Sequence, residues 1–236
     1  MQTPQFIDMC KKFTHSLLSQ YCLLCAATQA EATGLCPACL ADLPWLPPQL
    51  CPQCALVSSD AQVCGHCLRS APAFDRTRAL FSYRYPLDAL LQRYKYDHLL
   101  NLAHTFAGLL ERTLTSAEPP DMLIPMPLHA LRLRERGFNQ ALEIARPLAK
   151  KLDLSLDAQS CARIRMTAPQ VSLPLKRRIG NMRRAFSCAT RLDGMRVALL
   201  DDVMTTGASL NALADTVRAA GAIHVECWVV ARTLQE

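Results

Sequence analysis

The chain has 236 residues, of which 50% are hydrophobic, enough for one α/β domain with a small additional module but too few for two ordinary enzyme domains. No uninterrupted apolar stretch approaches the roughly 20 residues that cross a bilayer, and the first residues lack the pattern of a secretory signal, so we expect a cytoplasmic protein without membrane insertion. The net charge of +6 is uneven, because residues 130–184 hold thirteen Lys and Arg against four Asp and Glu. This composition suits a phosphate, a diphosphate or a nucleic-acid backbone, and equally a solvated helix face.

The first third of the chain contains four identical CxxC pairs, which use eight of its twelve cysteines. The pairs are Cys22/Cys25, Cys36/Cys39, Cys51/Cys54 and Cys64/Cys67. A CxxC turn presents two thiolates that match two corners of a tetrahedral Zn²⁺ site, and a segment this short has little core to hold it without metal. We therefore predict a double zinc ribbon with two structural zinc ions over residues 21–72, after an N-terminal segment at 1–20.

Other uses of these cysteines fit less well. A reducing compartment disfavours disulfides, and redox chemistry uses one CxxC beside a βαβ pattern. Sequential pairing lets each ribbon close locally, although a crossed pairing satisfies the same spacing. His66 is expected to support the site or face solvent, since four sulfurs already complete it. The unpaired cysteines are expected to be small hydrophobes; they are Cys10, Cys161, Cys188 and Cys227.

The predicted elements then follow one another in chain order. Residues 44–53 read as a proline-rich connector between the ribbons and residues 70–74 as the exit from them. The pattern next predicts a strand at 79–85, a helix from about 87, a helix at 98–114, a strand at 122–127, a helix at 139–151, a strand at 195–203, a helix at 208–220 and a strand at 223–231. This alternation predicts a second domain at 73–236 with a parallel sheet flanked by helices, whose ligands gather at the carboxyl ends of the strands.

The most informative segment follows the strand at 195–203. Its polar and small residues are Asp201, Asp202, Thr205, Thr206, Gly207, Ala208 and Ser209. Amides at a helix N-terminus, together with the loop hydroxyls, suit a phosphate dianion, and the glycine lets the backbone approach it closely. The two acids at the end of the strand suit ribose hydroxyls or the Mg²⁺ that accompanies a diphosphate.

This segment resembles the PRPP-binding motif of type I phosphoribosyltransferases, in which two acids and Thr-Gly-X-Thr/Ser follow a hydrophobic strand. The resemblance implies an α/β fold of the type I phosphoribosyltransferase kind, with PRPP and magnesium as ligands. In such enzymes the loop after the preceding strand holds the diphosphate, which arginine forks suit. Here that loop would comprise Pro127, Leu128, His129, Arg132, Arg134 and Arg136.

Residues 163–186 resemble the mobile catalytic loop of glutamine amidophosphoribosyltransferases, which would close over PRPP and exclude water. The residues implied are Arg163, Arg165, Thr167, Gln170, Arg177 and Arg178. Lys95 either adds a phosphate contact or is an exposed helix lysine.

Taken together, the CxxC pairs, the Pro-Met-Pro-Leu-His and Arg-Gly-Phe-Asn-Gln stretches and the Asp-Asp-Val-Met-Thr-Thr-Gly loop resemble the ComF family, which includes the GntX branch. The resemblance spans nearly the whole chain and implies a role in natural transformation, where incoming single-stranded DNA is received on the cytoplasmic side. Met204 replaces a more usual Ile or Val, and we expect this to alter packing and not the site.

Four functions stay open at this stage. A transferase needs an acceptor-binding hood that the sequence does not reveal. A DNA-handling protein would use the basic segment, with Tyr83, Tyr85, Tyr94 and Tyr96 as candidate base-stacking residues. A scaffold would dock a DNA-uptake helicase or channel protein through its ribbons, and a metabolic role linked to gluconate or purine salvage also remains open.

Overall fold

The computed structural model describes residues 21–28, 30, 33–97, 99–114, 118–165 and 185–234. The chain divides into two compact units, residues 1–43 and residues 44–236. The division falls between the second and third CxxC pairs, whereas the sequence prediction placed all four pairs in one module. The described part of the first unit contains cysteine turns and a short helix, α2 (Pro37–Ala41).

The predicted connector at 44–53 joins the second unit because it pairs with the first strand of that unit. Trp45 forms an antiparallel bridge with Phe81, and their rings lie 4.4 Å apart. The Ser82 amide donates to the Pro44 carbonyl at 2.8 Å. The third and fourth CxxC pairs are therefore part of the same unit as the sheet.

The second unit is built on a five-stranded sheet in the order β1-β7-β6-β2-β3, and all its pairs are parallel. The strands are β1 (Arg76–Ser82), β2 (Met122–Pro125), β3 (Ser155–Leu156), β6 (Arg196–Met204) and β7 (His224–Arg232). A separate antiparallel hairpin joins β4 (Cys161–Arg163) to β5 (Phe186–Cys188). The predicted parallel sheet flanked by helices is confirmed.

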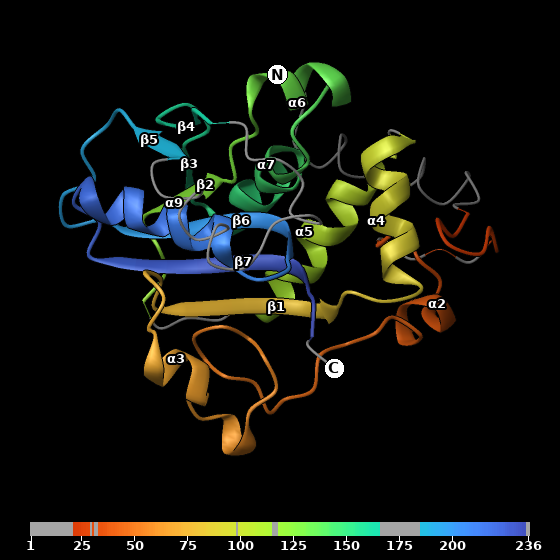
Figure 1. Ribbon diagram of the computed structural model, residues 1–236. Helices are drawn as coiled ribbons and strands as arrows, with labels where there is room; N and C mark the ends of the chain where they lie inside the picture. Colours follow the sequence, from red (N-terminus) through yellow and green to blue (C-terminus); the bar gives the residue numbers. More distant parts are fainter. Residues whose placement is uncertain are drawn as a thin grey trace, which may run out of the picture. The chain divides into compact units, whose positions relative to one another are not determined.

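Helices cover both faces of this sheet (Figure 1). The helices of the second unit are α3 (Gly65–Arg69), α4 (Leu87–Tyr96), α5 (Asn101–Thr113), α6 (Ala130–Arg136), α7 (Gln140–Leu152) and α9 (Ala208–Ala219), with a short 3₁₀ turn, η1, at Ser59–Ala61. α9 lies across one face, with α5 and α7 on the other. No helix in the described part of the chain has the length and apolarity to cross a membrane.

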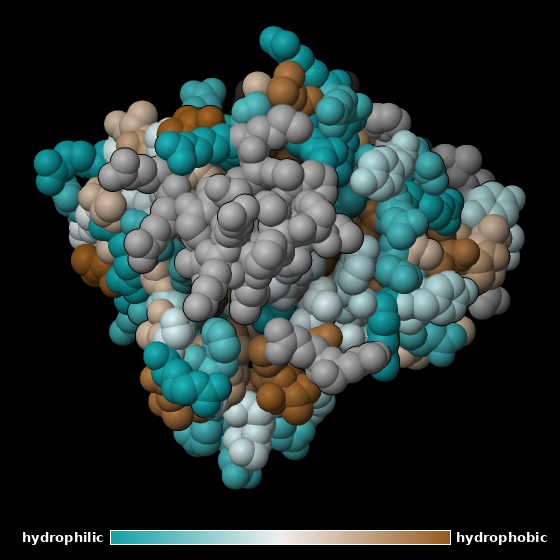
Figure 2. Space-filling view, in the orientation of Figure 1, coloured by the Kyte–Doolittle hydropathy of each residue, from teal (hydrophilic) through white to brown (hydrophobic). Residues whose placement is uncertain are grey.

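Alternation along β6 explains how the core forms. Val197 and Leu199 project to the same side of the strand and are fully buried in one cluster with Leu213 and Val217 of α9. Both elements thus bury the apolar face that their periodicity predicts. On the side seen in Figure 2, hydrophobic residues of the described chain form small separate patches among hydrophilic ones.

One segment that we expected to be a loop is a helix. Residues 130–136 form α6, and the Leu131 amide in its first turn donates a hydrogen bond to Nδ1 of the cap residue His129 at 3.3 Å. The helix ends at Gly137, whose φ of 81° is left-handed. The physical reason is local, because Ala, Leu, Arg and Glu all favour helix and glycine stops it.

Candidate phosphate and metal sites

The loop between β6 and α9 is shaped by one glycine. Gly207 has a φ of 81°, and a Cβ built on it would lie 2.7 Å from Met204 Cε. The left-handed φ strains any residue with a side chain, and a Cβ would also displace the flexible end of Met204. Met204, which we expected only to alter packing, is 2% exposed.

The loop and the start of α9 form an open pocket with the groups that a phosphate needs. The pocket has a volume of about 90 Å³ and is lined by residues 201 and 203–210. Thr205 and Thr206 are exposed and Ser209 is half-buried. α9 has no side-chain cap at Gly207, although the Ala208 amide donates to Thr206 Oγ1 at 3.3 Å. Amides in the first turn of a helix lack partners within the helix and attract anions.

The two acids at the end of β6 have opposite electrostatic surroundings. Asp202 is 4% exposed and forms an ion pair with Lys95 of α4. Burial opposes its ionisation, but the Lys95 ammonium outweighs burial and lowers the pKa of Asp202. Burial, followed by the charge of Asp202, raises the pKa of Asp201 well above its usual value. Asp202 is therefore the carboxylate that ionises readily. The charged form of Asp201 would be stabilised by a nearby cation or hydrogen-bond donor.

Lys95 thus forms a cluster with Asp201 and Asp202, which we call the acid cluster. It is not an exposed helix lysine. Its side chain is 18% exposed. Burial disfavours its charged form, yet the Asp202 carboxylate raises the pKa of Lys95 overall. The sequence offered a weak signal, a lysine in the last turn of a helix, but could not show which acid it meets.

Two arginines, Arg136 and Arg163, interact electrostatically with these acids. The charge of Arg136 helps to lower the pKa of Asp202, and its guanidinium lies 5.5 Å from the centre of the Tyr96 ring. Burial lowers the pKa of Arg163, which also senses the charges of Asp201 and Arg132. Positive charge from α6 and β4 therefore converges on the carboxyl end of β6.

The other residues predicted to hold a diphosphate lie around α6. Pro127 and Leu128 are half-buried before the helix, and His129 is its N-terminal cap. Arg132 pairs with Glu135 at 3.2 Å, and Arg134 is exposed. Their role in binding stays a prediction. The expected loop was wrong, because these arginines belong to a helix.

The predicted mobile loop is described only at its base. Arg163 ends β4, and Arg165 follows it two residues later. Thr167, Gln170, Arg177 and Arg178 lie outside the described residues.

The tyrosines proposed to stack bases separate into two groups. Tyr94 is fully buried and donates to the Gln140 carbonyl at 2.8 Å, so it packs the core and cannot stack a base. Tyr85 and Tyr96 are 77% and 67% exposed, and Tyr96 lies beside the acid cluster through its contact with Arg136.

The eight paired cysteines form two clusters that match the sequential pairing. Cys22, Cys25, Cys36 and Cys39 form one cluster, and Cys51, Cys54, Cys64 and Cys67 form the other, with the sulfurs of each within 4.8 Å of one another. Backbone amides donate to sulfur in both clusters, from Cys39 to Cys36 Sγ at 3.4 Å and from Cys64 to Cys51 Sγ at 3.3 Å. Four sulfurs at this spacing fit a tetrahedral zinc ion. Of the unpaired cysteines, Cys161 and Cys227 are buried, Cys188 is half-buried, and Cys10 lies outside the described residues.

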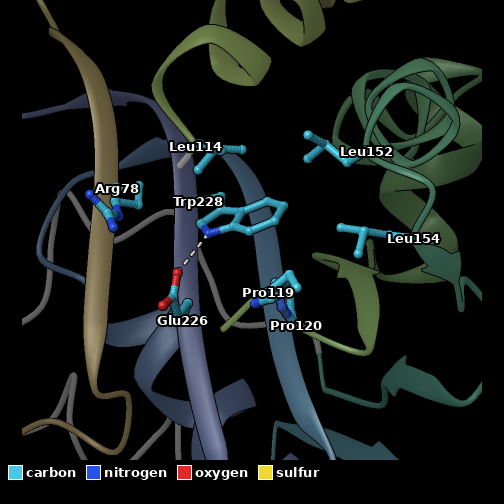
Figure 3. Close-up of a pocket in the computed structure, with 8 residues that line it drawn as sticks. All are labelled: Arg78, Leu114, Pro119, Pro120, Leu152, Leu154, Glu226 and Trp228. Atoms are coloured by element: carbon cyan, nitrogen blue, oxygen red, sulfur yellow. Dashed lines mark hydrogen bonds between the residues drawn. The ribbon is translucent and has the colours of Figure 1, made fainter. Parts of the chain in front are cut away.

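A further pocket lies towards the amino ends of the strands (Figure 3). Its volume is about 80 Å³, and most of its lining is apolar, including Leu114, Leu152 and Leu154. The Trp228 indole N–H donates to the Glu226 carboxylate at 3.1 Å. Ligands of parallel sheets bind at the opposite ends of the strands, so this pocket is not the predicted site.

The fold and the sites define a protein with two cysteine clusters of the zinc-ribbon kind and an α/β domain built on a parallel sheet. The family model for the double zinc ribbon domain matches residues 13–68. DNA utilization protein YhgH of Salmonella typhimurium is 33% identical over 192 residues, which cover 78% of this chain and 85% of the relative. Competence protein F of Haemophilus influenzae is 33% identical over 209 residues, which cover 84% and 90% of the two chains. The chain belongs to the ComF family of competence proteins.

More distant proteins are also similar. Competence protein ComFC of Bacillus subtilis is 26% identical over 186 residues, or 75% of each chain. Among solved structures, the purine phosphoribosyltransferase from Pyrococcus horikoshii has a TM-score of 0.32 and 17% identity, covering 66% of this chain and 88% of the other. The glutamine PRPP amidotransferase from B. subtilis has a TM-score of 0.34 and 17% identity, covering 52% and 25%.

Proposed function

We propose that this chain binds PRPP with Mg²⁺ at the carboxyl end of β6 and acts in the cytoplasm, where it handles incoming single-stranded DNA during natural transformation. The observation that carries the first part is the arrangement of Asp201, a hydroxyl-rich loop and the start of α9 around one pocket. Relatives named for competence and for DNA utilization support the second part.

In this proposal each part of the pocket has one task. The 5′-phosphate accepts hydrogen bonds from the first amides of α9 and from the hydroxyls of Thr205, Thr206 and Ser209. Asp201 and Asp202 supply oxygen atoms for ribose hydroxyls or for Mg²⁺, which prefers such ligands. Arg132, Arg136 and Arg163 balance the charge of the diphosphate. The magnesium ion would supply further positive charge at that diphosphate.

Calorimetric titration of the zinc-loaded protein with PRPP and Mg²⁺ tests this binding. We expect the wild type to bind and Asp201→Asn to weaken binding at least tenfold. The matched control is Asp193→Asn, since Asp193 is an exposed acid outside the pocket that pairs with Arg191 at 2.6 Å. A folded, zinc-loaded wild type that gives no binding heat contradicts the proposal.

The DNA-handling part is tested separately. Exposed Tyr85 and Tyr96 and the arginines of α6 offer stacking surfaces and positive charge, which together bind single strands. Fluorescence anisotropy with a labelled oligonucleotide should show an affinity that falls steeply between 50 and 200 mM salt, as about three phosphate contacts would produce. Affinity that is absent at both salt concentrations excludes direct DNA binding and leaves a helicase or channel protein of DNA uptake as the partner to be sought.

A second candidate function is phosphoribosyl transfer to a base or amine. The positive charges near the acid pair favour it, those of Arg136 near Asp202 and of Arg163 near Asp201, because a leaving diphosphate must be neutralised. Diphosphate release that requires a particular nitrogen acceptor supports transfer. PRPP binding with no release across a panel of purines, pyrimidines and amines supports a binding role alone.

A further inference from the structure

One buried arginine connects the second cysteine cluster to the loop between β6 and α9. We call this loop, residues 204–207, the phosphate loop. Arg232, the last residue of β7, is 3% exposed. Its Nε donates to the Cys54 carbonyl at 2.8 Å. Its Nη1 donates to the carbonyls of Met204 and Thr233, each at 3.0 Å, and to that of Thr205. A single guanidinium thus joins a CxxC turn to the loop that follows β6.

The CxxC turn at this contact is also fixed to the edge strand of the sheet. The Thr77 amide donates to the Pro52 carbonyl at 3.0 Å, and the Thr77 hydroxyl donates to the Gln53 carbonyl. Three successive carbonyls, at residues 52, 53 and 54, therefore accept from β1 and β7. The position of the turn and the position of the sheet are determined together.

The orientation of the phosphate loop depends on the same guanidinium. When the carbonyls of Met204 and Thr205 point towards Arg232, the following amides are turned away from it, because the two ends of a peptide unit point in opposite directions. Those amides belong to the loop that lines the pocket. A buried guanidinium that loses its acceptors is left with an unsatisfied charge, which destabilises the fold, so we expect the loop and the turn to keep or lose this arrangement together.

We propose that Arg232 is a positioning residue through which metal occupancy of the second cysteine cluster controls the affinity of the phosphate loop. With a metal on Cys51, Cys54, Cys64 and Cys67, the turn presents its Cys54 carbonyl to Arg232 and the loop is held in its binding conformation. Without the metal the turn loosens, Arg232 loses one acceptor and the loop becomes less ordered. The coupling is reciprocal, so a bound phosphoribosyl ligand retains the metal. This inference rests on the proposed PRPP binding only for its ligand readout.

Two cysteine variants separate this coupling from general damage. Cys64→Ser weakens the second cluster, and Cys25→Ser is the matched control in the first cluster, which lies in the other unit. Hydrogen exchange of a peptide covering residues 201–210 is measured in both. We expect faster exchange at 204–209 in Cys64→Ser only. Equal exchange in the two variants would overturn the proposal, and this readout needs no ligand.

The ligand readout then tests reciprocity. PRPP with Mg²⁺ should slow zinc transfer from the second cluster to a chromogenic chelator about tenfold, and Cys64→Ser should weaken PRPP binding by a similar factor. A wild type that does not bind PRPP but keeps the exchange difference refutes the proposed function and retains the coupling. PRPP binding that is identical in both cysteine variants refutes the coupling.

The role of Arg232 itself is tested with Arg232→Lys, which keeps the charge but cannot reach both sets of carbonyls. We expect weak PRPP binding that no longer responds to zinc removal. Thr77→Val is the control, because it removes a hydroxyl bond to the same turn without touching the loop. A lysine variant whose PRPP affinity still falls on zinc removal shows that the coupling does not pass through Arg232.

Discussion

Gly207 shows how a single backbone position can determine a binding loop. Its left-handed φ of 81° disfavours a side chain, and a Cβ would displace the Cε end of Met204. The sequence prediction attributed this glycine to close approach of a phosphate, and the structure adds a second reason within the protein itself.

We therefore predict that Gly207→Ala reduces stability by about 1–2 kcal/mol, because alanine is strained at positive φ, and that it also weakens PRPP binding. Gly108→Ala is the matched control, since a Cβ at this site in α5 meets nothing within 4 Å and alanine favours helix by up to about 1 kcal/mol. Thermal denaturation and calorimetric titration compare the two. Equal melting temperatures would contradict the strain argument.

The acid pair at the end of β6 predicts a conflict between stability and binding. Burial raises the pKa of Asp201, so its contribution to stability is present at acid pH and is lost as pH rises through the raised value. At neutral pH Asp201→Asn should raise the melting temperature by about 2–4 °C for each kcal/mol gained, while PRPP binding weakens. Melting curves at pH 7 and pH 4 test this, because the gain should shrink at the lower pH.

Asp202 should respond with the opposite sign. Lys95 lowers the pKa of this buried carboxylate, so the stability that it contributes is present above the ordinary Asp pKa and is lost as pH falls through the lowered value. Asp202→Asn leaves Lys95 with a buried, uncompensated charge and should cost about 3 kcal/mol. Two variants that shift the melting temperature in the same direction would refute this assignment.

At the scale of elements, α6 changes how the basic segment should be interpreted. Residues 132 and 136 are four apart and share one helix face, whereas residue 134 lies on the opposite face. The charge of Arg136 helps to lower the pKa of Asp202, and the charge of Arg132 helps to lower the pKa of Arg163, so we expect these two arginines to face the pocket. As a loop, the same segment would have given all three arginines equal access.

The resulting prediction separates the arginines by face. Arg136→Gln should weaken PRPP binding about tenfold, because it removes a charge-assisted contact that is worth about 1.5 kcal/mol. Arg134→Gln, the same change on the other face, should alter binding less than twofold. Titrations at two salt concentrations measure both, and equal losses in the two variants would mean that the helix face does not determine the contact.

At the scale of the whole molecule, the two cysteine clusters should contribute to different transitions. The first cluster lies in the unit 1–43, and the second lies in the unit 44–236 that contains the sheet. The second cluster also contacts β1 and β7 through Thr77 and Arg232. Loss of its metal should therefore weaken the sheet domain as well as the ribbon.

Differential scanning calorimetry can distinguish the two clusters. Cys51→Ser should lower the melting temperature of the main transition by several degrees, on the order of 5 °C for a loss of about 2 kcal/mol. Cys22→Ser should leave that transition unchanged and remove one bound zinc. A main transition that falls equally in both variants would contradict this division of the chain.

The amino-acid sequence was sufficient wherever the signal is local. CxxC spacing predicted the two cysteine clusters. Alternation and helical periodicity predicted the main strands and helices of the sheet domain, and the continuous segment 197–209 predicted the pocket after β6. In each case the residues concerned are close in sequence and therefore close in space.

Only the tertiary structure decided which distant groups meet. It paired Lys95 with Asp202, buried Tyr94, placed the 130–136 arginines on a helix, and joined Cys54 to the phosphate loop through Arg232, 178 residues away. These contacts depend on the order and register of the strands. The periodicity of a single segment does not determine that order, so the contacts are decided by how the elements pack together.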